Sequence, residues 1–287
     1  MDKYTQANNL TTEEITRLKR LAVNIRKQVI NMIYSGKHGH TGGSLSCADI
    51  LTALYFHVLN IKPENPCWED RDRFIMSKGH SVEALYAILA EAGFFSKKLL
   101  ETYGQFKSPL AGHPVKEVPG VELNSGALGH GLSVGVGMAI AGKRMNKNFK
   151  VFVLMGDGEQ NEGSVAEAAI AGSFYQLDNL VAIIDRNRLQ ISGNTEDVMA
   201  LEPLKNRWEA FGWNVEEFDG HDLAEIIHAL KDNPHRKNVP RLFIANTIKG
   251  KGISFIENDY KWHHRVPDDE QYQRALRELQ RQLKNIN

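Results

Sequence analysis

Cysteine is scarce in this chain. Only Cys47 and Cys67 occur among 287 residues, and they form no C-x-x-C pair. A fold held together by disulfides and a cysteine-rich structural zinc site are therefore disfavoured. The same usage fits a reducing compartment, so we expect a cytoplasmic protein.

Long hydrophobic runs and net charge are also missing. No apolar stretch approaches the roughly 20 residues that a membrane-spanning helix needs, and the polar residues 1–14 lack a signal-peptide core. The 35 lysines and arginines balance the 35 aspartates and glutamates. A chain without net charge has no global field that attracts nucleic acid or an anionic membrane. We expect neither partner.

The chain does contain an alternation of short apolar runs and amphipathic stretches. Val151–Met155 and Leu180–Asp185 have the composition of strands buried on both faces, and Ser164–Gln176 between them has helical periodicity. The alternation continues to a last strand at Arg241–Thr247. It predicts an α/β fold with a doubly wound parallel sheet and helices on both faces. We expect a single domain over residues 1–287, in which the charged segment 268–287 is a terminal helix.

Two polar residues follow the two central strands. Asp157 lies in the turn 156–158, and Asn187 comes directly after the second strand. In a right-handed parallel crossover both strands end at the same edge of the sheet, so these side chains can meet. A carboxylate and an amide oxygen suit a hard divalent cation such as Mg²⁺, which leaves coordination positions for phosphate oxygens. The alternative interpretation is that Asp157 only caps the helix that follows.

Histidines recur in turns and at strand ends. His40 lies in the Gly/His-rich loop 36–44, His80 follows a short predicted strand, and His113 precedes a proline in a turn. Imidazole titrates near neutral pH, and glycine lets a backbone approach a ligand closely. Because ligands of such sheets bind along the carboxyl ends of the strands, we expect a site there.

Two further loops belong to this predicted edge. Residues 126–131 form a Gly-rich loop that leads into a helix, where backbone N–H groups can hold phosphate or a flat ring. Lys249 lies in a mobile basic loop after the last strand. Residues 131–135 also match the G-x-S-x-G pattern of hydrolases, but that motif requires a preceding strand, and none is predicted.

Several ordered motifs extend the pattern over most of the chain. The central G-D-G…N unit resembles the motif that binds thiamine diphosphate through a divalent cation. The supporting motifs are GHTG at 39–42, RDRFIMSKGH at 71–80, AGHP at 111–114, GVELNSGALGHG at 120–131, TIKGKG at 247–252, and Trp262-His263. Together, from about Thr11 to Arg265, they resemble the N-terminal, diphosphate-binding third of transketolase.

The resemblance implies thiamine diphosphate as cofactor and a metal ion that holds it. In that family an aspartate, an asparagine and a backbone carbonyl two residues later bind Mg²⁺, for which Ca²⁺ or Mn²⁺ can substitute. The corresponding residues here are Asp157, Asn187 and Leu189. The bound ion then holds the diphosphate.

The resemblance also implies roles for individual residues. The implied catalytic residues, which surround the cofactor's reactive carbon and the donor sugar, are His40, His80, His113 and His263. The residues implied to bind the cofactor are His80, Gly126, Leu128, Gly158, Glu162, Asn187 and Lys249. Among these, Glu162 is expected in a buried acidic link between paired active sites, and Lys249, like Lys78, near the cofactor or a substrate phosphate. The roles of His38, His130 and His264 stay open.

The implied reaction needs a second protein chain. In the family, the glutamate that activates the cofactor and the aromatic pocket around its pyrimidine ring belong to a second domain that this sequence does not contain. We therefore expect the N-terminal subunit of a split transketolase, paired with a separate C-terminal subunit in a heterotetramer that dimerises through this fold. It would transfer a two-carbon ketol unit from a ketose phosphate to an aldose or aldose phosphate. The polar start and the terminal helix favour natural chain ends over a truncated longer protein.

Other thiamine-dependent proteins share the central motif. The alternatives are the α subunit of a 2-oxo acid dehydrogenase, a chain like deoxyxylulose phosphate synthase, and a non-catalytic thiamine diphosphate-binding protein. The segments 71–80 and 111–114 carry histidines that face a sugar in transketolase, and they favour that family.

Overall fold

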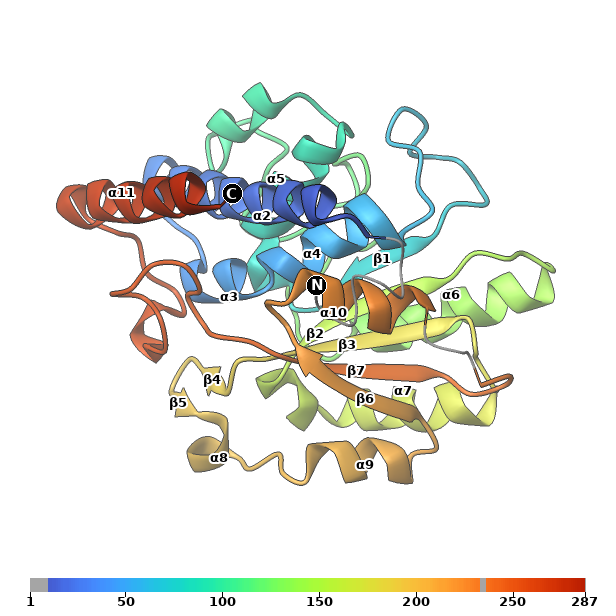
Figure 1. The fold of residues 1–287 in the computed structure, drawn as a ribbon. Coiled ribbons are helices and arrows are strands. Elements are labelled where there is room, and N and C mark those ends of the chain that lie inside the picture. The colour runs from blue at the N-terminus through green and yellow to red at the C-terminus, as the bar shows by residue number, and fades with distance from the viewer. Residues whose placement is uncertain (1–9, 233–235, 287) are drawn as a thin grey trace.

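The centre of the molecule is a sheet in which every strand runs parallel to its neighbours. The computed structural model describes residues 10–232 and 236–286. The strands are β1 (Arg73–Met76), β2 (Val151–Gly156), β3 (Leu180–Arg186), β6 (Asn214–Asp219) and β7 (Arg241–Asn246). Their order across the sheet is β1-β2-β3-β7-β6 (Figure 1). This arrangement confirms the predicted parallel α/β sheet.

The apolar runs of the strands are explained by burial on both faces. Along β2, Phe152 and Leu154 belong to one hydrophobic core, and Val151, Val153 and Met155 belong to the other. Successive side chains of a strand point to opposite faces, so a strand covered on both sides needs apolar residues at every position.

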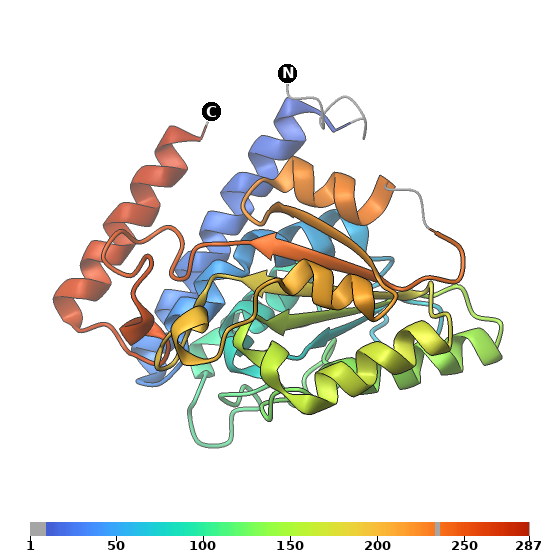
Figure 2. The same cartoon turned by 90° about the horizontal axis from the view of Figure 1, so that it is seen from below.

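Helices cover both faces of the sheet (Figures 1 and 2). Those whose residues share the first core are α2 (Thr12–Gly36), α4 (Ala48–Ala53), α5 (Val82–Ala92) and α10 (Leu223–Ile227). Those that share the second core are α6 (Gly131–Arg144), α7 (Gly163–Phe174) and α9 (Leu204–Ala210). Single π-helical turns, η1 (Leu54–Val58) and η5 (His228–Asp232), extend α4 and α10. The predicted doubly wound arrangement is therefore confirmed.

The predicted terminal helix is present as α11 (Asp269–Asn285), whereas Asn287 lies outside the described residues. It begins with a capping box, in which Asp268 accepts a hydrogen bond from the Gln271 backbone and Gln271 accepts one in return. Figure 2 shows α11 running beside α2, and Ala275 and Leu279 are fully buried in the first core.

One segment differs from its prediction. The Gly/His-rich loop 36–44 was expected to be irregular, but Thr41–Ser46 form a short, fully buried helix, α3. A Cβ atom added to Gly42 would lie 3.0 Å from the carbonyl oxygen of Trp262, and one added to Gly43 would lie 2.7 Å from Ser81 Oγ. The glycines therefore allow close packing, and this tertiary packing overrides their low intrinsic helix propensity.

Several short elements were not predicted. A hairpin of β4 (Leu189–Gln190) and β5 (Gly193–Asn194) follows β3 and leads into α8 (Thr195–Val198). Short 3₁₀ helices are η2 (Gly79–Ser81), η3 (Lys97–Thr102), η4 (Gly158–Asn161) and η6 (Tyr260–Trp262). No helix within 10–232 and 236–286 is long and apolar enough to cross a lipid bilayer.

Candidate active site

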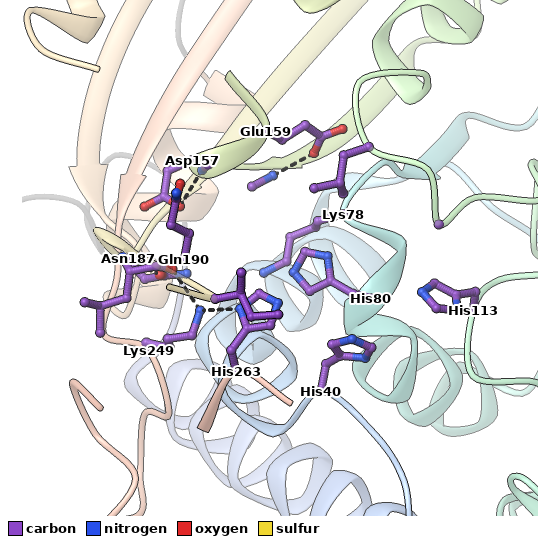
Figure 3. A pocket seen from close by; sticks show the side chains of 16 residues that line it. His40, Lys78, His80, His113, Asp157, Glu159, Asn187, Gln190, Lys249 and His263 are labelled. Carbon is purple, nitrogen blue, oxygen red and sulfur yellow. Dashed lines mark hydrogen bonds between the residues drawn. The ribbon is translucent and has the colours of Figure 1, made fainter. Parts of the chain in front are cut away.

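A cavity of about 400 Å³ lies where the central strands end. It is lined by His40, Lys78, His80, His113, Gly126, Leu128, Gly156, Asp157, Gly158, Glu159, Asn187, Leu189, Gln190, Ile191, Lys249 and His263. Figure 3 shows the imidazoles of His40, His80 and His263 gathered on one side, and Asp157 and Asn187 on the other. All the site residues predicted from the sequence line this cavity except Glu162.

Four histidines from four separate segments meet in the cavity. The ring centre of His40, the residue before α3, lies 5.4 Å from that of His80 and 5.7 Å from those of His113 and His263. The rings of His80 and His263 are stacked 5.1 Å apart. These segments are far apart in the chain, and the parallel sheet brings them together at the carboxyl ends of its strands, where the site was expected.

Burial keeps several of these imidazoles uncharged. It lowers the pKa of His40 to about 4 and that of His263 to about 3. Burial, aided by the charge of Lys78, holds the pKa of His80 well below its usual value. At neutral pH each of these rings therefore has one N–H donor and one nitrogen that can accept a proton.

Asp157, Asn187 and Leu189 lie together on the opposite side. Gly156 pairs with Asp185 across β2 and β3, so the residues that follow these strands are neighbours. Asp157 is 3% exposed, and its oxygens accept hydrogen bonds from the backbone N–H groups of Gly158 (2.8 Å) and Arg188 (2.5 Å). Asp157 therefore does cap a helical turn, as the alternative interpretation supposed, but it does so at the wall of a cavity.

The donor atoms offered by this group are all oxygens: a carboxylate, an amide and the Leu189 carbonyl. Within residues 10–232 and 236–286, no three side chains of His, Cys, Asp or Glu are grouped to hold a metal ion. The group around Asp157 is of another kind, since only one of its members belongs to those types.

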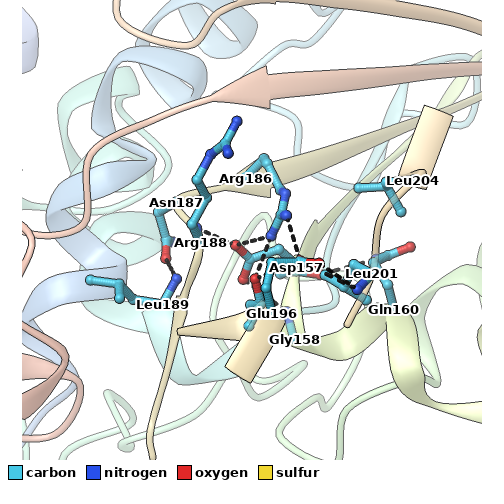
Figure 4. Close-up of polar contacts among 12 residues, drawn as sticks. Asp157, Gly158, Gln160, Arg186, Asn187, Arg188, Leu189, Glu196, Leu201 and Leu204 are labelled. Atoms are coloured by element: carbon cyan, nitrogen blue, oxygen red, sulfur yellow. Dashed lines mark hydrogen bonds and ion pairs between the residues drawn. The ribbon is translucent and has the colours of Figure 1, made fainter. Parts of the chain in front are cut away.

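A buried arginine that was not among the predicted site residues holds Asp157 (Figure 4). Arg186, the last residue of β3, is 1% exposed. Its guanidinium lies 3.4 Å from Asp157 Oδ2 and donates hydrogen bonds to Thr195 (2.7 Å), Glu196 and Glu202 (both 2.9 Å). Arg186 thus joins the carboxylate in the cavity to the segment after β5. The only sequence signal was its position beside Asn187.

Two lysines at the floor of the cavity are also buried. Lys249 was predicted in a mobile basic loop, but it is 2% exposed, and its ammonium donates to the Leu189 carbonyl (2.9 Å) and to Nδ1 of His263 (3.2 Å). Burial lowers the pKa of Lys249 to about 8. Lys78 pairs with Asp185 and donates to the Gly43 carbonyl (3.0 Å). Positive charge is therefore fixed inside the cavity wall.

Glu159 is a second residue that sequence reasoning missed. It is 1% exposed and accepts hydrogen bonds from Ser77 Oγ and from the backbone N–H groups of Gly129 and Gly156, both at 2.9 Å. Burial raises the pKa of its carboxyl group. Glu159 joins the ends of β1 and β2 to the Gly-rich loop 126–131. The sequence signal for it was its place two residues after Asp157.

Glycines in the cavity wall permit close contacts. Gly126 has a φ of 150°, and a Cβ atom there would lie 2.9 Å from the ring of His113. A Cβ atom on Gly158 would lie 2.8 Å from Gln190 Oε1. A side chain at either position would therefore force its neighbour to move.

The remaining candidates lie outside the cavity lining. Glu162 is exposed, directly before α7, and His130 is exposed before α6. His38 is stacked on Tyr103, with ring centres 4.7 Å apart. His264 contacts the ring of His40, with centres 4.6 Å apart. The structure therefore gives His264 a place beside the histidine group.

A match to a known protein family accounts for this arrangement. Residues 18–279 match the family described as transketolase, thiamine diphosphate binding domain. The chain belongs to the transketolase family. The predicted resemblance is thereby confirmed, and thiamine diphosphate is the cofactor of this family's domain.

The chain matches some relatives over nearly their whole length and others over less than half of it. The chain is 54% identical over 261 residues to one subunit of the apulose-4-phosphate transketolase of Phocaeicola vulgatus, covering 91% of this chain and 93% of that one. It is 39% identical over 272 residues to a 6-deoxy-6-sulfo-D-fructose transketolase subunit of a Clostridium species, covering 94% and 99%. A solved transketolase from Campylobacter jejuni has a TM-score of 0.86 and 31% identity, but the match covers 94% of this chain and 45% of that one. These matches favour transketolase over the 2-oxo acid dehydrogenase alternative.

Proposed function

We propose that this chain is the N-terminal, thiamine diphosphate-binding subunit of a two-chain transketolase. The enzyme transfers a two-carbon ketol unit from a ketose phosphate to an aldose or aldose phosphate. It is active only with a separate C-terminal subunit that carries the pyrimidine-binding domain. We also propose that residues 1–287 form one diphosphate-binding domain of a cytoplasmic enzyme.

The observation that carries the proposal is the composition of the cavity. Four histidines that can exchange protons and bind hydroxyl groups line a space that also contains Asp157, Asn187 and a buried lysine. The histidines suit the binding and deprotonation of sugar hydroxyl groups. Asp157, Asn187 and the lysine suit a diphosphate and its cation.

The residues present fit thiamine diphosphate and Mg²⁺. The oxygen atoms of Asp157, Asn187 and Leu189 match the preference of Mg²⁺ for hard ligands, and Lys249 supplies positive charge for a diphosphate. His40 Nδ1 is buried, and within the described residues no hydrogen-bond partner reaches it. A polar ligand or a water molecule in the cavity can form the hydrogen bond that this nitrogen lacks.

The individual roles follow from this fit. Asp157, Asn187 and the carbonyl of Leu189 would bind the ion, and Gly158 and Lys249 would contact the diphosphate. Gly126 and Leu128, which line the cavity, would contact the aminopyrimidine ring. When bound, the cofactor supplies the electron sink for cleavage of a carbon–carbon bond.

The chain's own histidines handle protons and hydroxyl groups. His40, His80, His113 and His263 bind the donor sugar, and a neutral imidazole among them accepts the proton of the donor's C3 hydroxyl. The low pKa values of His40 and His263 keep these rings in the basic form at neutral pH.

The need for a partner is supported by the lengths of the relatives. The chain covers nearly the whole of two proteins named as transketolase subunits, but less than half of the C. jejuni transketolase. We propose a heterotetramer in which two copies of this chain pair through the same fold. Glu162, exposed at the start of α7, is then free to join an acidic link between the paired sites.

The test is reconstitution. The chain and the product of a neighbouring reading frame that encodes a pyrimidine-binding domain are purified alone and together. Ketol transfer is then assayed with and without thiamine diphosphate and Mg²⁺. Activity is expected only from the pair with both additions. Ketol transfer by this chain alone would refute the two-chain proposal.

A further inference from the structure

A fully buried carboxylate lies behind the histidine group and has no part in the function proposed above. Glu83 is the second residue of α5 and is 0% exposed. It does not line the cavity. Negative charge is favourable in the first turn of a helix, because the backbone N–H groups of that turn have no partner within the helix and carry partial positive charge. A buried charge must nevertheless be compensated by specific donors.

Those donors come from the segment that carries His40. Glu83 Oε1 accepts a hydrogen bond from the backbone N–H of His40 (3.1 Å), and Oε2 accepts one from Ser44 Oγ (2.7 Å). His40 directly precedes α3, and Ser44 lies within it. One carboxylate therefore holds both ends of the turn from which the His40 side chain enters the cavity.

A glycine lets the chain pass close to this carboxylate. Gly39 has a φ of 147°, which few other residues adopt. A Cβ atom there would lie 2.5 Å from Glu83 Oε1 and 2.6 Å from Ile33 Cγ1. The absence of a side chain at Gly39 is thus what allows the next residue, His40, to present its N–H to Glu83.

A third donor fixes the carboxylate from the other side. Tyr103, 1% exposed, donates its hydroxyl to Glu83 Oε1 (2.7 Å) while its ring stacks on His38. Burial, with the charge of Glu83 beside it, raises the pKa of Tyr103, so the hydroxyl keeps its proton. The three hydrogen bonds form a charge-assisted network across α3, α5 and the segment after η3.

The side chain of His40 lacks such an anchor of its own. Its Nδ1 is buried, and no hydrogen-bond partner among the described residues reaches it. Its ring nevertheless contacts those of His80, His113 and His263. The position of the ring therefore depends on where the backbone of residue 40 is held.

We propose that Glu83 is a positioning residue for His40, holding the turn 39–44 so that the imidazole stays within the histidine group. The inference rests on the proposed function for the role of His40 itself. Without the carboxylate, the His40 N–H and the Ser44 hydroxyl lose their acceptor, and the turn loosens. A small displacement of a catalytic group has a large effect on rate.

The test uses the assembled two-subunit complex and two measurements. In Glu83→Ala, deuterium exchange of a peptide covering residues 39–44 should rise at least tenfold. Turnover should fall about 10- to 100-fold, whereas affinity for thiamine diphosphate, by calorimetry, should change less than threefold. Glu83→Gln should recover most of both losses, because its amide oxygen can accept from His40 and Tyr103 while its NH₂ donates to Ser44 Oγ.

Glu91→Ala is the matched control, because Glu91 lies on the same helix and contacts Gln28 and Lys97 rather than the turn. It should leave exchange at 39–44 and turnover unchanged. If Glu83→Ala cannot be isolated, Tyr103→Phe removes one donor and should raise the same exchange several-fold. Exchange like that of the unmodified complex in these variants, or a Gln variant no better than Ala, would overturn the proposal. Exchange is read independently of ketol transfer, so an inactive unmodified complex refutes the proposed function without affecting this test.

Discussion

At the residue scale, Asp157 serves two purposes at one position. It caps the turn after β2 through Gly158, and it presents a carboxylate to the cavity while Arg186 and the Arg188 backbone hold its other oxygen. Burial raises its pKa, with the charge of Asp185 adding to this effect. A bound cation would offset that desolvation, which is why a carboxylate at this site is suited to a metal ion.

Replacing the charge alone tests the metal role. In Asp157→Asn, the assembled complex should lose at least tenfold in Mg²⁺-dependent affinity for thiamine diphosphate, measured by calorimetry, because an amide is a weaker ligand than a carboxylate. Asp197→Asn is the matched control, since Asp197 is an exposed carboxylate that accepts a hydrogen bond from Asn194. Unchanged affinity in the Asp157 variant would refute the metal role.

His80 provides a second test at the residue scale. Its ring centre lies 5.4 Å from that of His40 and 5.1 Å from that of His263, and it lines the cavity. His80→Ala should lower turnover about 100-fold or more, the usual effect of losing a proton-transfer group, while cofactor affinity stays nearly constant. His57→Ala, outside the cavity, is the control. If the His80 variant fails to assemble with its partner, then His80 is structural.

At the scale of elements, the sequence predicted what depends on local pattern. The β2-α7-β3 unit follows from the spacing of its apolar residues, and the structure confirms it. The helix α3 could not be predicted, because its glycines are explained only by contacts with Ser81 and Trp262. Burial of Lys249 likewise depends on a residue distant in the chain, Leu189. The hydrogen bonds of Arg186 are to Thr195 and Glu202, which follow the β4–β5 hairpin, and this hairpin was not predicted.

The docked helix α11 holds the loop that carries Lys249 and His263. Glu278 accepts from the backbone N–H (2.7 Å) and the hydroxyl (2.9 Å) of Ser254, and Gln282 donates to the Gly252 carbonyl (2.7 Å). We expect Glu278→Ala and Gln282→Ala to raise deuterium exchange across residues 250–256 and to lower turnover several-fold. Gln280→Ala, on the exposed side of the same helix, should do neither. Equal effects of the Gln280 and Gln282 variants would argue against this role of α11.

At the scale of the whole molecule, the buried histidines link stability to pH. In the unfolded chain an imidazole is protonated below its ordinary pKa of 6.5, whereas folded His40 stays neutral to about pH 4 and His263 to about pH 3. Between these limits the unfolded state binds more protons, so the free energy of unfolding falls as the pH decreases from 6.5 toward 4. The melting temperature of the ligand-free chain should therefore drop steadily over that interval.

A single substitution separates the contribution of a buried histidine to the pH dependence of stability from the contribution of the buried carboxylates. Burial raises the pKa values of Asp157 and Glu159, and these groups act in the opposite direction as the pH falls. The unmodified chain is therefore compared with His263→Asn, because both proteins contain these two carboxylates. In the variant, the side-chain oxygen of Asn can still accept the hydrogen bond from Lys249. The variant has one titrating imidazole fewer, so its melting temperature should fall less steeply between pH 6.5 and 4. Parallel melting curves for the two proteins would show that His263 is protonated alike in the folded and unfolded states, contrary to its burial beside Lys249.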